Sequence, residues 1–250
     1  MPKTNPYVGL ALSGGGARGF AHVGVLRALE EQGVSPTVIS GTSMGAIIGG
    51  LIAAGYTASD IEAMALDKAN LRIFNVRGFK FGLSAHGYVR KTLERLLPQT
   101  FEALKIPLYI SATNLTTAKH TVFSSGNLIE AILASISIPL IFKPICINGE
   151  YYADGGLVKN LPASNIRDKC DVLIGSHVNH MPGNFSLKTT GQLLDRAIRI
   201  SIHNTIEAEA NLCDVYIDPE KCGHFDVLNF KVFDDIVNTG YQEALKKLKP

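Results

Sequence analysis

The residues with the clearest chemical potential are Gly41-Thr42-Ser43-Met44-Gly45, which fit the pattern G-x-S-x-G. This pattern builds a sharp turn between a strand and a helix, and the turn holds a serine hydroxyl clear of the sheet as a nucleophile. Gly41 and Gly45 leave out side chains that would collide there. A helix beginning at Met44 would direct its N-terminal dipole and free amides at the serine. The alternative is an ordinary tight turn, but a predicted strand before it and an apolar helix after it favour a nucleophile at Ser43.

A glycine-rich run, Gly14-Gly15-Gly16-Ala17-Arg18-Gly19, is the second candidate. Consecutive glycines let several backbone amides converge on an anion. That anion would be either a nucleotide phosphate or the oxyanion of an acyl intermediate. The run satisfies G-x-G-x-x-G, but no carboxylate ends the next predicted strand, and no lysine followed by serine or threonine completes a P-loop. The sequence therefore favours an oxyanion loop, with a plain turn as the remaining alternative.

The third candidate, Asp154-Gly155-Gly156, follows the second strand of a predicted hairpin. The hairpin is indicated by Asn148-Gly149 between the apolar runs 145–147 and 150–153, because an Asn-Gly pair is a strong turn signal. An aspartate followed by two glycines is common in ordinary turns. Beside the other two motifs, it is a candidate catalytic carboxylate.

In this order, the three motifs resemble the signatures of the patatin-like phospholipases. A fourth segment, Ala134-Ser135-Ile136-Ser137-Ile138-Pro139, is similar to the A-S-x-x-x-P segment of that family. The resemblance spans about residues 8–162, and the short chain is most similar to the small bacterial members. Each motif is weak alone, but the ordered set is specific.

The resemblance implies a serine–aspartate dyad without histidine. Ser43 would attack an ester carbonyl, and Asp154 would act as general base and then help water to release the acyl-enzyme. The backbone of Gly14, Gly15 and Gly16 would hold the oxyanion. Arg18 matches a basic position of the family motif, and either anchoring of the loop or contact with a phosphate would explain it. No cofactor is implied.

Histidines offer an alternative to the dyad. A serine–aspartate–histidine triad would need a histidine after Asp154, and the chain order permits His177, His203 or His224. Against a triad, only two predicted strands precede the serine. The pairs His177/His180 and Cys222/His224 have too few ligands at familiar spacing for a metal, so none is predicted.

Alternating strands and helices must position these residues. Short apolar runs predict strands over 8–12, 37–40, 108–113, 172–178 and 215–217. Helical periodicity predicts helices over 20–32, 44–54, 60–66 (capped by Ser59), 128–134, 192–210 and 234–248. This alternation predicts an α/β fold, a three-layer α/β/α arrangement with a mainly parallel central sheet. With no linker or repeat, residues 1–250 are expected to form one hydrolase domain.

Composition limits the partners. The net charge of +2 gives no reason to expect nucleic-acid binding. The four cysteines lack paired spacing, so we expect reduced and mostly buried thiols. No signal sequence or apolar stretch of 18 residues is evident, so a cytoplasmic location and, at most, peripheral membrane contact are predicted.

A basic segment over 68–93 is the expected membrane contact. It has three phenylalanines, three glycines and no acidic residue, and it is predicted to be a lid or a patch for anionic lipid. The alternative is a solvated loop with its phenylalanines in the core. Its basic residues are Lys68, Arg72, Arg77, Lys80, Arg90 and Lys91.

The function expected from the resemblance is hydrolysis of lipid acyl esters through an acyl-enzyme, by a phospholipase A, lysophospholipase or esterase. The alternatives are an acyltransferase on the same dyad, a triad esterase, and a catalytically silent binding protein. The intact Ser43, Asp154 and glycine loop argue against the last. Head group, acyl length and oligomeric state cannot be read from the sequence.

Overall fold

The computed structural model describes residues 6–66, 85–139, 141–183, 187, 190–227 and 229–248. The strands are β1 (Val8–Leu12), β2 (Val38–Thr42), β3 (Leu108–Asn114), β4 (Lys119–Phe123), β5 (Ile145–Ile147), β6 (Glu150–Asp154), β7 (Val172–Ser176) and β8 (Val215–Ile217). The helices are α1 (Ala21–Glu31), α2 (Met44–Ala54), α3 (Ala58–Leu66), α5 (Ala85–Leu96), α6 (Leu128–Ser135), α7 (Thr190–Ala210) and α8 (Phe233–Lys247). Short 3-10 helices cover Gly16–Phe20, Phe101–Ala103, Gly155–Leu157, Ala163–Asn165, Arg167–Lys169, Glu220–His224 and Phe230–Val232.

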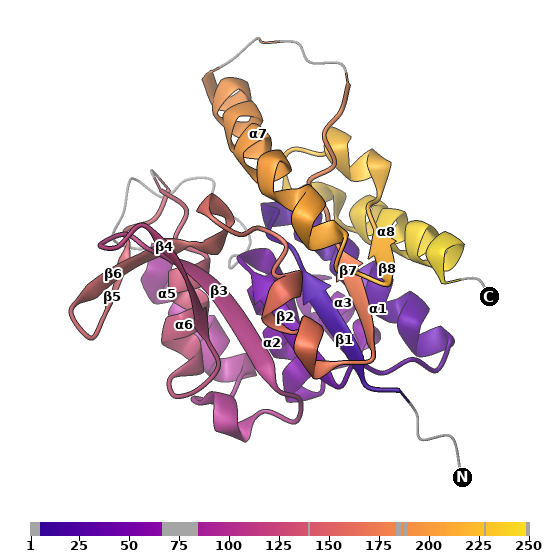
Figure 1. Cartoon of the computed structure of the whole chain (residues 1–250), viewed down its shortest axis with the longest axis horizontal. Coiled ribbons are helices and arrows are strands. Elements are labelled where there is room, and N and C mark those ends of the chain that lie inside the picture. Colours follow the sequence, from indigo (N-terminus) through magenta and orange to yellow (C-terminus); the bar gives the residue numbers. More distant parts are fainter. Residues whose placement is uncertain are drawn as a thin grey trace.

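One eight-stranded sheet runs through the molecule (Figure 1). β1 lies between β2 and β7, and β3 and β8 extend this parallel core on either side. β4, β5 and β6 add antiparallel pairs beyond β3. Both faces of the central strands are covered, because every residue of β1 and β2 is buried. Fully buried parallel strands explain the continuous apolar run of β1.

The edge of β3 brings two distant segments together. Ser111 pairs with Thr42 of β2 and with Val122 of β4, whereas the next residue, Ala112, pairs with Asp154 of β6 and again with β4. A strand residue has one neighbour on each side, so β2 and β6 share the same edge of β3, end to end. The last residue of β2 and the last residue of β6 therefore meet at adjacent positions.

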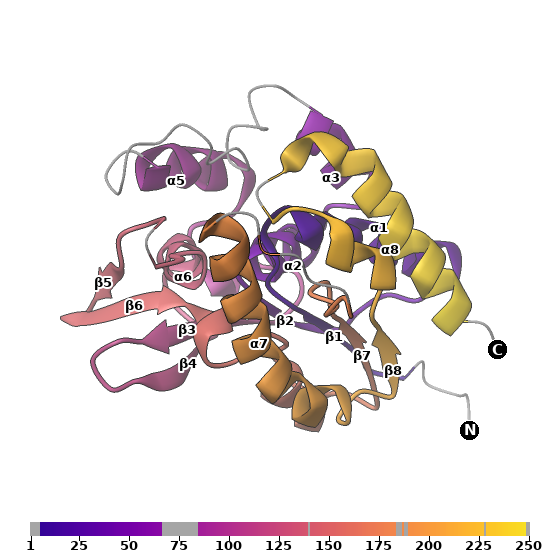
Figure 2. The same cartoon turned by 90° about the horizontal axis from the view of Figure 1, so that it is seen from above.

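Helices lie on both faces of the sheet, as predicted (Figure 2). The larger core packs α1, α2, α6 and α8 against one face and includes Leu10, Ile39 and Ile174. The alternate strand residues Ala11 and Leu173 point to the other face, where they meet α7 and the segment 161–166. The fold is the mainly parallel, three-layer arrangement that the sequence predicts.

α1 and α8 pack with their backbones in close contact. A Cβ placed on Gly24 would lie 1.9 Å from the Val237 carbonyl oxygen, and one on Gly240 would lie 2.0 Å from that of Ala21. Both positions therefore require glycine. The first and last described helices of the chain are joined by this contact.

Most predicted elements agree with the structure within a few residues, and four details differ. β4 and α5 were not predicted. The helix predicted from Phe20 begins at Ala21, after a 3-10 turn over Gly16–Phe20. The cap of α3 is Thr57 rather than Ser59, because the Thr57 hydroxyl accepts a hydrogen bond from the Asp60 amide at 3.2 Å.

Three further expectations concern the whole chain. Among the described residues, none of the helices combines the length and apolar character needed to cross a membrane. All four cysteines are free, although only Cys222 is buried and Cys146 is exposed, so burial is less complete than predicted. The assignment of residues 1–250 to one domain stays a prediction.

Candidate active site

Ser43 occupies the turn between β2 and α2, and its backbone is strained. Its φ of 55° and ψ of −120° lie where side chains are rarely accommodated. The flanking glycines explain how the turn closes: a Cβ on Gly41 would lie 2.3 Å from the Gly45 oxygen, and one on Gly45 would lie 2.3 Å from the Leu12 oxygen. The predicted sharp strand-to-helix turn is therefore present, with both glycines at close approaches.

The Ser43 hydroxyl donates a hydrogen bond to Asp154 Oδ2 at 2.6 Å. The two residues are 111 positions apart and are joined where β2 and β6 meet along β3. Both are buried, with exposed fractions of 5% and 7%. A short bond between a hydroxyl and a carboxylate in a dry environment is the geometry that proton transfer from a nucleophile requires.

Burial raises the pKa of Asp154 to about 6, while hydrogen bonds from the Ser43 hydroxyl and the Gly156 amide act in the opposite direction. The Gly156 amide donates to Asp154 Oδ1 at 2.7 Å, so each carboxylate oxygen has one donor. A carboxylate with this pKa is a stronger base than an ordinary aspartate and is still largely ionised at pH 7.

The end of α6 holds both members of this pair. The Ser135 hydroxyl accepts a hydrogen bond from the Ser43 amide at 2.8 Å and donates to the Ser111 carbonyl at 2.7 Å. The Ser137 carbonyl accepts from the Asp154 amide at 3.0 Å. The sequence analysis identified the segment 134–139 by resemblance and gave it no role. In the structure, this segment accepts hydrogen bonds from the backbone amides of Ser43 and Asp154.

The glycine loop lies directly against Ser43. A Cβ on Gly14 would be 3.1 Å from the Ser43 Cβ. The Gly14 amide is already used, since it donates to the Asn160 carbonyl at 3.2 Å. Within the described part of the chain, the amides of Gly15 and Gly16 donate to no other group. Two of the three predicted oxyanion glycines thus have amides available for an anion.

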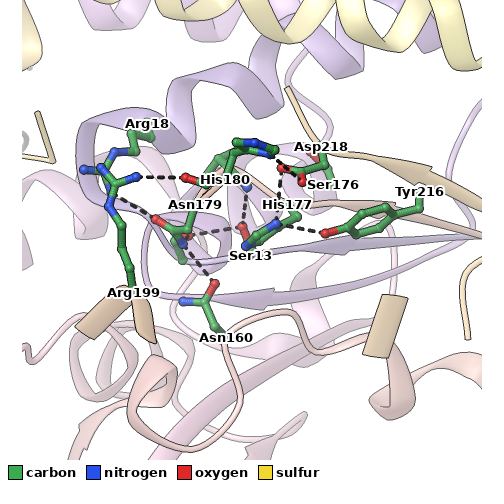
Figure 3. Close-up of polar contacts among 12 residues, drawn as sticks. Ser13, Arg18, Asn160, Ser176, His177, Asn179, His180, Arg199, Tyr216 and Asp218 are labelled. Carbon is green, nitrogen blue, oxygen red and sulfur yellow. Dashed lines mark hydrogen bonds and ion pairs between the residues drawn. The ribbon is translucent and has the colours of Figure 1, made fainter. Parts of the chain in front are cut away.

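Arg18 is 1% exposed, which is unusual for a charged side chain. Its Nη1 donates to Asn179 Oδ1 at 3.2 Å (Figure 3). Its Nε donates to the Phe225 carbonyl at 2.8 Å. These contacts tie the glycine loop to later parts of the chain. Of the two roles that the sequence left open for Arg18, the geometry favours loop anchoring.

Behind the loop, His22 is completely buried, and burial lowers its pKa to about 4. Its Nε2 lies 2.9 Å from the Ser13 carbonyl oxygen, which can only accept, so Nε2 carries the proton. Its Nδ1 then accepts from the Ser176 hydroxyl at 2.8 Å. A neutral His22 therefore joins the start of the loop to the end of β7.

The histidines proposed for a triad have other surroundings. His177 is buried, with Nδ1 2.9 Å from the Tyr216 hydroxyl and 3.3 Å from Asp218 Oδ1, and the described residues show no bond from it to Ser43 or Asp154. His203 and His224 are exposed. Among the described residues there is also no cluster of three groups able to hold a metal.

Two asparagines complete the site and were not predicted. Asn160 accepts through its carbonyl from Gly14 and through Oδ1 from Asn179 Nδ2 at 3.0 Å. A Cβ on Gly156 would lie 2.9 Å from Asn160 Nδ2, so Asn160 connects the glycine loop to the aspartate turn. Neither asparagine stands in a motif that the sequence analysis used, and only the folded chain reveals them.

Comparison with known proteins shows a family match over much of the chain. The model of the family described as patatin-like phospholipase matches residues 10–166. Lysophospholipase nte1 of Emericella nidulans is 28% identical over 279 residues, which cover 97% of this chain but 18% of the relative. An uncharacterized NTE family protein of Mycobacterium bovis is 39% identical over 171 residues, which cover 66% of this chain and 46% of the relative. The chain thus spans less than half the length of these relatives.

Among solved structures, VipD from Legionella pneumophila has a similar fold. The match has a TM-score of 0.58 and 17% sequence identity, and it covers 98% of this chain and 67% of VipD. At this identity, the likeness concerns the fold alone.

Proposed function

The chain belongs to the patatin-like phospholipase family, and from this premise we propose that it hydrolyses lipid acyl esters with Ser43 as nucleophile and Asp154 as general base. The observation that carries the proposal is the buried 2.6 Å hydrogen bond from Ser43 Oγ to Asp154 Oδ2. Two of the relatives that match along nearly the whole chain are named lysophospholipases. We therefore take a glycerophospholipid with one acyl chain as the first substrate to test.

The reaction begins when Ser43 Oγ attacks the ester carbonyl carbon and its proton passes to Asp154 Oδ2. The carbonyl oxygen becomes an oxyanion, and the free amides of Gly15 and Gly16 stabilise it; preorganised donors of this kind contribute about 3–4 kcal/mol each. Asp154 then returns the proton to the leaving alcohol as the carbon–oxygen bond breaks. An acyl-enzyme remains on Ser43.

Deacylation repeats these steps with water as the nucleophile. Asp154 takes a proton from the water, the new oxyanion occupies the same amides, and Ser43 leaves as its hydroxyl re-forms. Burial raises the pKa of Asp154 to about 6, which supports Asp154 as the base of a dyad without histidine. The strained backbone of Ser43 keeps the hydroxyl at the turn between β2 and α2.

The test compares wild type with Ser43→Ala, Asp154→Asn and His203→Ala. We expect wild type to hydrolyse p-nitrophenyl esters and a lysophospholipid, and to be labelled by a fluorophosphonate probe. Ser43→Ala and Asp154→Asn should lose at least about 1,000-fold in kcat, in line with loss of a nucleophile or its base. His203→Ala changes an exposed residue and should match wild type.

Adding His177→Ala tests the triad alternative directly. The dyad predicts that this variant keeps most of its activity, provided that circular dichroism shows it to be folded. A loss as large as that of Ser43→Ala in a folded His177→Ala protein would replace the dyad with a triad. An unlabelled and inactive wild type would support the silent binding protein instead.

We also propose peripheral lipid contact through residues 68–93. Most of this segment, residues 68–84, lies outside the described residues, so the proposal is supported only by its basic and aromatic composition and by α5. There, Lys91 is exposed, whereas Arg90 pairs with Glu130 at 2.6 Å. Sedimentation with anionic and neutral vesicles tests it, and equal binding to both would contradict it.

A further inference from the structure

Asn179 lies at the centre of the contacts that hold the glycine loop. It follows β7 by three residues and is 5% exposed. Its Nδ2 donates to the Gly14 carbonyl at 2.6 Å and to Asn160 Oδ1 at 3.0 Å. Its Oδ1 accepts from Arg18 Nη1 at 3.2 Å. Figure 3 shows Asn179 between Arg18 and Asn160. One side chain therefore bonds to the loop, to its arginine and to the asparagine beside the aspartate turn.

The partners of Asn179 determine which way its amide points. Arginine has only donors, so the atom facing Arg18 must be the carbonyl oxygen Oδ1. The Gly14 carbonyl has only an acceptor, so the atom facing it must be the amino nitrogen Nδ2. An aspartate at this position would keep the acceptor for Arg18 but would lose the donor for Gly14.

Holding the Gly14 carbonyl also sets the direction of the Gly15 amide. In a planar trans peptide the carbonyl of one residue and the N–H of the next point in opposite directions. Glycines restrain their own backbone poorly, so the orientation of this peptide depends on outside contacts. The Ser13 hydroxyl provides a second, longer bond to the Gly14 carbonyl at 3.1 Å. The shorter contact comes from Asn179.

We propose that Asn179 is a positioning residue that directs the Gly15 amide at the oxyanion. The proposal rests on the function proposed above, in which this amide stabilises the tetrahedral intermediate. Asn179 acts through Gly14 and touches neither the nucleophile nor its base. Removing its donor frees the peptide between Gly14 and Gly15 to rotate, so stabilisation is lost in the transition state and not in the bound substrate.

The experiment compares Asn179→Asp with Asn114→Asp in otherwise native protein. Asn114 is also 5% exposed, and its Nδ2 donates to Glu150 while its Oδ1 accepts from the amides of Thr116 and Thr117. Both variants thus keep the acceptor, lose the donor and add one buried negative charge. Of these two asparagines, only Asn179 contacts the glycine loop. Asn179→Ala serves as a second variant in case the aspartate prevents folding.

The readouts are kcat and KM for a p-nitrophenyl ester, the Ki of a trifluoromethyl ketone analogue of the tetrahedral intermediate, and the melting temperature. For Asn179→Asp we expect kcat to fall about 10- to 100-fold, because one misdirected oxyanion donor costs less than its complete removal. KM should stay within about threefold, and Ki should rise by the same factor as kcat falls. Asn114→Asp should change the melting temperature but leave kcat and Ki unchanged.

Two results would overturn the proposal: a folded Asn179→Asp protein with wild-type kcat and Ki, or a Ki that stays constant while kcat falls. A merely structural role for Asn179 would lower the melting temperature without the matched change in kcat and Ki. If the wild type neither hydrolyses esters nor reacts with the fluorophosphonate, the proposed function itself fails. An active wild type with an unaffected Asn179→Asp variant rejects the role of Asn179 alone.

Discussion

At the scale of single residues, the site depends on a carboxylate that is costly to keep charged. Burial raises the pKa of Asp154 from 3.8 to about 6, and the difference corresponds to about 3 kcal/mol. Because the pKa of Asp154 is higher in the folded protein than in the unfolded chain, protonation of Asp154 favours the folded state. This contribution to the free energy of unfolding is complete below pH 3.8 and is lost as the pH rises through 6. At neutral pH the charged form of Asp154 therefore destabilises the fold, while the same charge provides the proposed base.

This pKa predicts the acid limb of the activity profile. We expect kcat/KM for a neutral ester to rise about tenfold per pH unit below pH 6 and to level off above it, because Asp154 accepts the serine proton only when ionised. Initial rates between pH 4.5 and 8 measure this, with circular dichroism at each pH to exclude unfolding. A limb centred near pH 4 would instead indicate an aspartate with ordinary solvation.

The sequence analysis named the candidate reactive residues, but it did not name Asn179 and gave no role to Ser135. Ser43, Asp154 and the glycines stand in short motifs, so they could be named as candidates from the sequence, with roles that the family resemblance implies. Asn179 and Ser135 act through single hydrogen bonds across long separations, 165 residues to Gly14 and 92 residues to Ser43. An asparagine or serine of this kind looks like any other until the fold brings its partner near.

At the scale of elements, α6 contributes through its last turn. The Ser135 hydroxyl satisfies the buried Ser43 amide, so Ser135→Ala leaves that N–H without its partner. We expect the free energy of unfolding to fall by about 1–3 kcal/mol and kcat to fall with it, since the strained turn loses a restraint. Chemical denaturation and ester kinetics measure the two effects.

Ser137→Ala is the matched control for that experiment. Its hydroxyl donates to the Leu133 carbonyl and lies 3.0 Å from His86 Nε2, while its contact with Asp154 uses the backbone carbonyl, which alanine keeps. Ser137→Ala should therefore lower kcat less than Ser135→Ala does. Equal losses of kcat in the two variants would show that the end of α6 tolerates no change and that Ser135 has no special role.

The two elements that the sequence analysis did not predict, β4 and α5, each have a weak sequence pattern. β4 reads Lys119-His120-Thr121-Val122-Phe123 and lies along the outer edge of β3, so it lacks the apolar run of a buried strand. α5 has Gly87 in its first turn, and its residues up to 93 were included in the predicted basic segment. By contrast, the hairpin was predicted from the Asn148-Gly149 pair between two apolar runs, and in the structure both residues adopt the positive φ, 52° and 83°, that this turn demands.

At the scale of the whole molecule, the contact between α1 and α8 closes the larger core. Gly240→Ala places a methyl group 2.0 Å from the Ala21 oxygen, so the helices must separate. We expect unfolding free energy to fall by about 1–3 kcal/mol or more. Gly87→Ala makes the same chemical change where nothing lies within 4 Å, and it should stabilise α5 by up to about 1 kcal/mol.

Thermal melts of the two variants decide this point. We expect Gly240→Ala to lower the melting temperature and Gly87→Ala to raise it. Both variants add the same methyl group, so the difference comes from the surroundings of the two glycines. A Gly240→Ala protein as stable as wild type would mean that α8 moves away from α1 at little cost. The core would then be less dependent on its last helix than the close backbone contact implies.

The anchoring of the glycine loop also has a consequence during synthesis. Residues 14–16 are translated well before the residues that anchor the loop: Asn179 binds the Gly14 carbonyl, the Phe225 carbonyl accepts from Arg18, and the Val227 carbonyl accepts from the Ala17 amide. A nascent chain that already contains Ser43 and Asp154 thus still lacks the contacts that hold the proposed oxyanion loop. Under the proposed function, we therefore expect a nascent chain to gain ester hydrolysis only after Val227 has been translated.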